Sequence, residues 1–92
     1  MTKYTVKFSN KIEKDLRLLE KREYDMSAFK ATVGKLACGE RLPPKNRDHA
    51  LSGNWTDYRE CHIEPDWLLI YRIENDILVL VLARTGTHSD LF

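Results

Sequence analysis

The start of the chain changes from a strand-like to a helix-like hydrophobic pattern. Between Lys3 and Phe8, apolar side chains occupy every second position with polar ones between them, an alternation typical of a half-buried β-strand. From about Asn10 to Arg22, isoleucine and leucine recur every three or four residues, which predicts an amphipathic helix. Ser9 or Asn10 can cap the amino end of this helix.

A second helix is predicted from about Asp25 to Cys38, where four apolar residues share one face. They are Met26, Phe29, Val33 and Leu36. Gly39 stands where a left-handed residue commonly ends a helix. The segment from Gly39 to Asp48 contains two consecutive prolines and several charges, so we expect a connecting loop there.

The rest of the chain returns to strand-like patterns. We expect a short extended piece at residues 49–52, a turn at Gly53-Asn54, and strands at about Thr56–Ile63, Trp67–Ile73 and Ile77–Arg84. The order is then one strand, two antiparallel helices and an antiparallel meander of three to four strands. This order predicts a single α+β domain over residues 1–92, with one sheet packed on the helices.

Composition indicates a folded domain. Hydrophobic residues make up 42% of the chain and charged residues 32%, which is too apolar for a disordered segment. The first residues lack the apolar core of a signal peptide, and the longest apolar run, Ile77–Ala83, is too short to cross a bilayer. We therefore expect a cytoplasmic protein without membrane contact. Cys38 and Cys61 form no Cys-x-x-Cys motif, and we assign neither a catalytic role.

Charge is distributed unevenly along the chain. Residues 1–47 carry 12 Lys and Arg against 6 Asp and Glu, whereas residues 48–92 carry 3 against 8. A basic first half can bind nucleic acid, because neutralising phosphates gives affinity that does not depend on base sequence. A solvated helix surface would show the same excess.

Two hairpin loops decide which side chains of the meander lie opposite each other. If Glu64-Pro65-Asp66 is a three-residue loop, His62 pairs with Leu68. If Glu74-Asn75-Asp76 is another, Leu68 pairs with Leu82. Because side chains alternate across a sheet, these pairings assign every strand residue to a face.

One face of the predicted sheet collects groups that can do chemistry. The pairings place on it His62, Asp66, Leu68, Leu82 and Arg84. A turn at Thr85-Gly86-Thr87 would bring His88 to the same end. The other face should receive the helices; it carries Cys61, Ile63, Trp67, Leu69, Tyr71, Ile73, Ile77, Val79, Val81 and Ala83. A slip of one residue or a bulge would exchange the faces.

Histidines beside an arginine and a carboxylate suit RNA cleavage by the neighbouring 2′-hydroxyl. That reaction needs a base for the hydroxyl, an acid for the leaving oxygen and a cation for the phosphate. Imidazole can fill both proton roles, and Arg84 can bind the phosphate. Trp67 and Phe92 can stack on unpaired bases. No metal or other cofactor is required.

Two other interpretations of these residues remain open. Taken singly, each histidine is more often structural than catalytic. A metal site could instead use the set His49, His62, Asp66 and His88. Their spacing matches no compact ligand motif, however, and Arg84 beside them would oppose a bound cation.

Three motifs stand out in the second half of the chain. They are Asp48-His49-x-Leu51-x-Gly53-x-Trp55, then Tyr58-Arg59-x-x-His62-x-Glu64-Pro65-Asp66-Trp67-x-Leu69-Ile70-Tyr71, and finally Arg84-Thr85-Gly86-Thr87-His88 with Leu91-Phe92. This pattern resembles the YafQ-type toxins of the RelE superfamily, the ribosome-associated mRNA interferases of bacterial type II toxin–antitoxin pairs. The two predicted helices match that family in placement and size only.

The resemblance implies a RelE-like sheet covered by two helices, and cleavage of mRNA in the ribosomal A site without a metal. The implied partners are a cognate antitoxin, the 70S ribosome with its rRNA, and mRNA. By resemblance, the acid–base positions are held by His49, His62, Asp66 and His88, the phosphate-stabilising position by Arg84, and positions lining the RNA site by Trp67 and Phe92. His49 enters by resemblance alone. The alternative is a non-catalytic toxin or binding module of the same fold that inhibits a protein target.

Overall fold

The computed structural model describes residues 2–92 and confirms the α+β class. The elements are β1 (Thr5–Phe8), α1 (Asn10–Lys21), α2 (Met26–Ala37), the 3₁₀ turn η1 (Pro44–Asn46), β2 (His49–Ala50), the 3₁₀ turn η2 (Gly53–Trp55), β3 (Arg59–Glu64), β4 (Trp67–Glu74), β5 (Val79–Gly86) and α3 (His88–Leu91). Both long helices lie where the hydrophobic spacing predicted them. The short α3 was not predicted.

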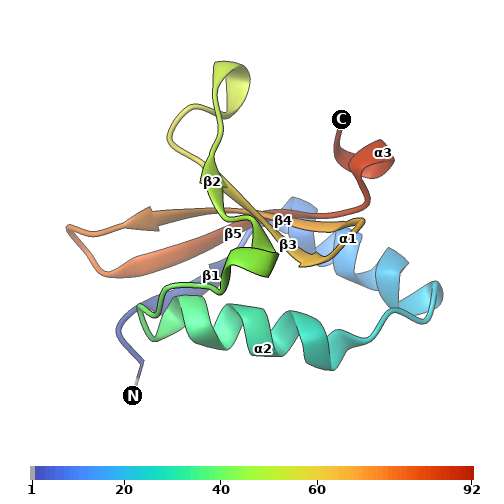
Figure 1. Cartoon of the computed structure of the whole chain (residues 1–92), viewed down its shortest axis with the longest axis horizontal. Helices are drawn as coiled ribbons and strands as arrows, with labels where there is room; N and C mark the ends of the chain where they lie inside the picture. The colour runs from blue at the N-terminus through green and yellow to red at the C-terminus, as the bar shows by residue number, and fades with distance from the viewer. Residues whose placement is uncertain (1) are drawn as a thin grey trace.

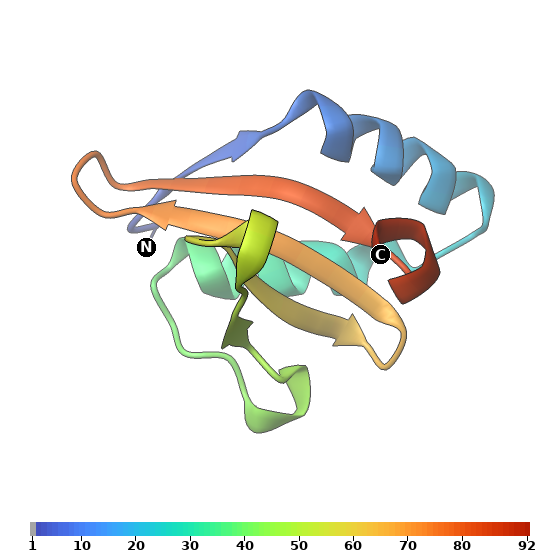
Figure 2. The ribbon, with the colours of Figure 1, turned by 90° about the horizontal axis from the view of Figure 1, so that it is seen from above.

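The strands form one mixed sheet in the order β1-β5-β4-β3-β2. Strands β2 to β5 are antiparallel to their neighbours, as expected for a meander, whereas β1 pairs in parallel with β5. In Figure 1, α2 runs beneath the sheet, while β2, η2 and α3 rise on its other side. Figure 2 shows β5, β4 and β3 side by side, with α1 along the β5 edge. The two long helices therefore pack on one face. The other, called the open face below, has no long helix on it, although its central residues Leu68 and Ile70 are only 1% and 0% exposed.

Local signals in the sequence account for both helices. The Ser9 hydroxyl accepts a hydrogen bond from the backbone N–H of Ile12 and so caps α1, and the Asp25 carboxylate caps α2 through the N–H of Ser27. Gly39 follows α2 with a φ of +77°, the left-handed conformation that glycine adopts without strain. None of the helices in residues 2–92 is long and apolar enough to cross a membrane.

The predicted β3–β4 register is partly correct. His62 pairs with Leu68 as expected, but Trp67 pairs with Glu64 rather than with Ile63. The connection is a two-residue turn, Pro65-Asp66, and a bulge between His62 and Glu64 absorbs the remaining residue. Asp66 consequently lies in the turn, beyond the end of the ladder.

The predicted β4–β5 register is wrong by four residues, because Leu68 pairs with Gly86 and not with Leu82. The loop spans residues 75–78, so it is one residue longer than the predicted loop and begins one residue later; these differences shift the register by three residues. A bulge in β5 shifts it by one residue more. Contacts from the start of the chain hold this loop: the Tyr4 hydroxyl donates to the Asn75 side chain. A contact between residues 71 apart in the chain cannot be predicted from local sequence patterns.

The changed register moves some side chains to the other face. Leu80 and Leu82 are buried in the core against the helices, whereas Val79 and Val81, expected there, are only half-buried. Beyond the β5 bulge the alternation is restored, and Arg84 pairs with Ile70 on the open face. The prediction that Arg84 and His62 share a face is therefore correct, although Leu82 does not join them.

Candidate active site

Two histidine rings face one buried carboxylate on the open face of the sheet. His49 on β2 lies opposite Glu60 on β3, with 3.5 Å between its Nε2 and Glu60 Oε1. His62, two residues further along β3, places its Nε2 4.0 Å from the same oxygen. The Glu60 side chain is only 8% exposed, so its carboxylate lies between the rings and largely out of solvent.

Backbone carbonyls bind the other nitrogen of each ring. Nδ1 of His49 lies 2.8 Å from the carbonyl oxygen of Arg47, and Nδ1 of His62 lies 3.2 Å from that of Pro65. Because a carbonyl oxygen can only accept, each Nδ1 carries a proton. Nε2 is therefore the nitrogen that can exchange a proton in both rings, and Glu60 balances the charge when either is protonated there.

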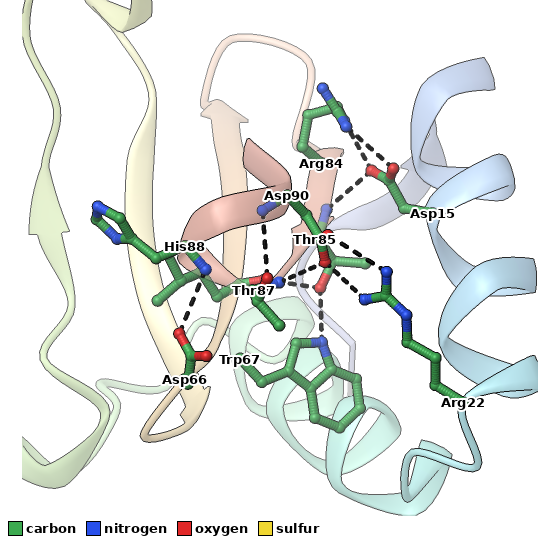
Figure 3. A network of polar contacts seen from close by, with 10 residues as sticks. Asp15, Arg22, Asp66, Trp67, Arg84, Thr85, Thr87, His88 and Asp90 are labelled. Atoms are coloured by element: carbon green, nitrogen blue, oxygen red, sulfur yellow. Dashed lines mark hydrogen bonds and ion pairs between the residues drawn. The ribbon is translucent and has the colours of Figure 1, made fainter. Parts of the chain in front are cut away.

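Arg84 is held by α1. Its Nε and Nη2 donate to the two carboxylate oxygens of Asp15 at 2.7 Å and 3.1 Å, and Asp15 also accepts from the backbone N–H of Thr85 at 3.1 Å (Figure 3). The hydrogen bonds that Arg84 donates to Asp15 raise the pKa of Arg84 more than partial burial lowers it, so the guanidinium stays charged. The Nη1 group, which Asp15 does not bind, remains available to a phosphate oxygen.

The chain turns sharply after Gly86, the last residue of β5, to form α3. Thr87 and Asp90 make a capping box, each accepting from the backbone of the other. Arg22, which follows the last residue of α1, donates to Asp90 at 2.9 Å, and this bond lowers the pKa of the Asp90 carboxyl. A Cβ at Gly86 would come within 3.0 Å of an Asp90 carboxylate oxygen, so the turn needs glycine at this position. Together these contacts tie the end of the chain to α1.

This turn carries His88 to the loop between β3 and β4. The Asp66 carboxylate accepts from the backbone N–H of His88 at 3.3 Å (Figure 3). The rings of His88 and Phe92 lie 5.1 Å apart, centroid to centroid, and Phe92 is 56% exposed. The structure thus brings Asp66, His88 and Phe92 together, with the His88 and Phe92 side chains open to solvent.

The candidate residues form two groups rather than one contact cluster. One is His49 and His62 around Glu60, and the other is Asp66, His88 and Phe92. A single row across the sheet runs His49, Glu60, Ile70, Arg84, one residue from each of β2, β3, β4 and β5. Three strand spacings separate its ends, which is about 14 Å between backbones. The next row, His62, Leu68, Gly86, leads to the turn with Asp66 and His88. An extended strand of RNA could lie across these rows and meet both groups.

Trp67 lies on the helix-covered face and is 1% exposed, as the β3–β4 register predicts. Its Nε1–H donates to the Thr85 hydroxyl at 2.9 Å, and its ring packs edge-on against Tyr24, with 5.1 Å between centroids. Thr85 in turn donates to the Leu68 carbonyl. A ring this deeply buried has no face on which a base can stack, so any effect of Trp67 on RNA must pass through Thr85 and the strand ends.

The structure adds two residues that the sequence did not single out. Glu60 had a signal, because its spacing of two from His62 already places both on one face of a strand. Asp15 had none, because its contact with Arg84 joins residues 69 apart in the chain. Among residues 2–92, no group of three or more His, Cys, Asp or Glu side chains is arranged to hold a metal ion.

The fold and this face define a class: a small α+β domain that presents imidazole, carboxylate and guanidinium groups on the sheet face away from α2. Such groups can move protons and bind an anion.

Comparison with known proteins specifies the family. A family profile described as the bacterial toxin of a type II toxin–antitoxin system, YafQ, matches residues 4–92. The mRNA interferase toxin YafQ of Escherichia coli K12 is 39% identical over 93 residues, covering 100% of this chain and 99% of that protein. The chain therefore belongs to the YafQ family of type II toxin–antitoxin toxins.

Solved structures agree with this assignment. A metal-bound toxin from Helicobacter pylori is 43% identical with a TM-score of 0.91, and 100% of each chain is covered. YafQ in the Escherichia coli DinJ–YafQ toxin–antitoxin complex is 38% identical with a TM-score of 0.89, and 98% of each chain is covered. The resemblance inferred from the three motifs is thus confirmed at the level of fold and family.

Proposed function

We propose that this protein is an endoribonuclease that cleaves mRNA in the ribosomal A site by acid–base catalysis, without a metal. The observation that carries the proposal is the pair of imidazoles whose Nδ1 atoms are bound by carbonyls and whose Nε2 atoms face Glu60 on the open sheet. The curated relative from Escherichia coli K12 bears the name mRNA interferase, which supports the same activity here.

The reaction needs no group beyond those on this face. A base removes the proton of a ribose 2′-hydroxyl, the freed oxygen attacks the adjacent phosphorus, and an acid protonates the leaving 5′-oxygen. We assign these proton transfers to the group His49, His62, Asp66 and His88. Arg84, held by Asp15, stabilises the charge that develops on the phosphate. Phe92, exposed beside His88, stacks on a base.

Two macromolecular partners complete the proposal. The exposed face of α1 carries four cations, Lys11, Lys14, Arg17 and Lys21, which suit contact with rRNA on the ribosome. A cognate antitoxin should neutralise the protein, as expected from the complex between YafQ and the antitoxin DinJ.

Mapping of mRNA 5′ ends after induced expression tests the activity. We expect new ends within translated codons and none in untranslated messages. Growth arrest with intact messages would instead indicate a non-catalytic toxin that inhibits a protein target.

A second arm tests metal independence, because a metal-bound relative is known from Helicobacter pylori. Cleavage by the purified toxin on ribosomes, with magnesium kept for the ribosome, should persist after a zinc- and copper-selective chelator is added. Loss of cleavage that added zinc or copper restores would contradict the metal-free mechanism.

A further inference from the structure

A hollow of about 510 Å³ adjoins His62 on the side away from Arg84. It is lined by Lys45, Asn46, Arg47, His62, Ile63, Glu64 and Pro65. Its two sides differ in character. The turn η1 and the residue after it supply two cations, whereas the end of β3 and the turn after it supply apolar Ile63 and Pro65. A nucleotide has the same two characters, a charged phosphate and the apolar face of a base.

The cationic side of the hollow is fixed to both histidine-bearing strands. The Asn46 side chain, in a residue only 8% exposed, donates to the backbone carbonyl of His62 at 2.7 Å. Arg47 ends η1 in the left-handed conformation, with φ 48° and ψ 44°, and its carbonyl accepts from His49 Nδ1. Figure 2 shows this segment beside β3. Lys45 and Arg47 therefore project from a backbone that is held in place.

We propose that this hollow binds one nucleotide of the RNA strand that is cleaved, with its phosphate at Lys45 and Arg47 and its base against Pro65. The inference rests on the proposed function, since it assigns a binding site to that substrate. The bound nucleotide lies next to the scissile phosphate on the His62 side, and the strand then crosses β4 towards Arg84 and His88. Glu64, exposed beside Pro65, opposes the phosphate and directs it to the cationic side.

Three variants test the site with a non-cleavable probe, an RNA trinucleotide that has hydrogen in place of the 2′-hydroxyls of its first two nucleotides. The double variant Lys45→Gln, Arg47→Gln should bind it about tenfold more weakly. In a plot of log affinity against log salt concentration, the slope should become shallower by about 0.7 for each phosphate contact removed. Glu64→Gln should bind more tightly than the wild type. The matched control Lys30→Gln, Lys35→Gln removes two exposed charges from α2, beneath the sheet, and should bind as the wild type.

Cleavage kinetics on translating ribosomes should show the same division. In the Lys45→Gln, Arg47→Gln variant we expect KM for mRNA to rise about tenfold while kcat stays within about twofold, because the lost contacts bind the strand before and during reaction alike. Binding of the double variant equal to that of the Lys30→Gln, Lys35→Gln control would overturn the proposal.

Two further outcomes distinguish a site for the cleaved strand from a contact with rRNA. Sedimentation with vacant ribosomes should be unchanged in the Lys45→Gln, Arg47→Gln variant, and a loss there would assign these cations to rRNA and contradict a site for the cleaved strand. If the wild type cleaves no mRNA yet the trinucleotide shifts the NMR signal of the Asn46 side-chain amide, the proposed function fails and the nucleotide site stands.

Discussion

Glu60 is the residue on which the arrangement of the two β-strand histidines depends. Its carboxylate is buried, and no Lys or Arg of residues 2–92 forms an ion pair with it; the basic groups beside it are the imidazoles of His49 and His62. A buried charge without a permanent counter-ion is costly for stability. A buried carboxylate can nevertheless stabilise an imidazolium that forms during the reaction. Removal of the Glu60 charge should therefore raise stability and lower activity.

The variant Glu60→Gln tests this expectation. It keeps the side-chain volume but removes the charge that balances a protonated imidazole, so we expect cleavage to slow by about tenfold. At alkaline pH, where imidazoles are uncharged, the melting temperature should rise because the unpaired charge is gone. The control Glu74→Gln breaks an ion pair with Arg72 at the far end of the sheet. A Glu60→Gln protein that cleaves mRNA like the wild type would show that Glu60 has no part in catalysis.

Cys61 offers a direct check of the core. Burial, followed by the nearby charges of Asp48 and Glu60, raises the pKa of its thiol to about 12. The thiol is therefore protonated and unreactive at pH 8. A disulfide reagent should label the half-buried Cys38 in the native protein and reach Cys61 only after unfolding. Rapid labelling of Cys61 in a folded Cys38→Ala variant would contradict the packing described.

At the scale of elements, α1 positions both parts of the site that follow β5. Asp15 binds Arg84, and Arg22, at the carboxyl end of the helix, binds Asp90. Neither contact was predicted, because each joins segments far apart in sequence. The sequence patterns predicted α1 from its apolar stripe, but an apolar stripe carries no information about which polar residue meets β5.

Asp15→Asn should lower cleavage without unfolding the protein. The amide keeps one acceptor but cannot make the paired bonds to Arg84, so we expect a loss of about tenfold in kcat. The NMR signal of the Arg84 Nε–H should lose its protection from solvent exchange, which a merely structural effect elsewhere would not cause. The control Glu20→Gln alters an exposed carboxylate on the same helix. Full cleavage together with a protected Arg84 signal would refute the positioning role.

The Arg22–Asp90 pair should hold α3 in a pH-dependent manner. Arg22 lowers the pKa of Asp90 below its usual value of 3.8. A depressed carboxyl pKa contributes stability that is present above 3.8 and is lost as pH falls through the lowered value. In Arg22→Gln we expect the Asp90 pKa to return towards 3.8 and the backbone amides of α3 to exchange faster, with little change in melting temperature because the pair is exposed.

Carboxyl titration by NMR measures the Asp90 pKa, with Lys35→Gln as the charge control on α2. An Asp90 carboxyl that titrates identically in the wild type and in Arg22→Gln would show that the pair does not hold α3.

For the whole molecule, local sequence patterns predicted the helices, the strands and the class of fold, since these depend on hydrophobic spacing and caps. They did not predict the β4–β5 register. That register depends on a loop held by Tyr4 and on a bulge in β5. Arg84 still reached the expected face because a shift of four residues preserves the alternation of side chains.

The candidate site, too, was predicted only in part from the sequence. His62 and Arg84 followed from strand alternation, and His49 followed only from the family motif. Convergence of His62, Asp66, Arg84 and His88 was expected. The structure brings Asp66 and His88 into contact, whereas His62 on β3 and Arg84 on β5 are separated by the width of β4. The open face between them is where we expect the RNA strand to lie.

Cleavage of mRNA on translating ribosomes by a His62→Ala, His88→Ala double variant tests the central claim most directly. Each substitution removes one proposed proton-transfer group, His62 on β3 or His88 on α3. Both side chains lie outside the hydrophobic core, so melting temperature and circular dichroism should show that the fold survives. Histidine acid–base catalysis predicts that 5′-end mapping finds no toxin-dependent cleavage. A folded double variant that cleaves at the wild-type codons and rate would contradict this catalysis on the open face.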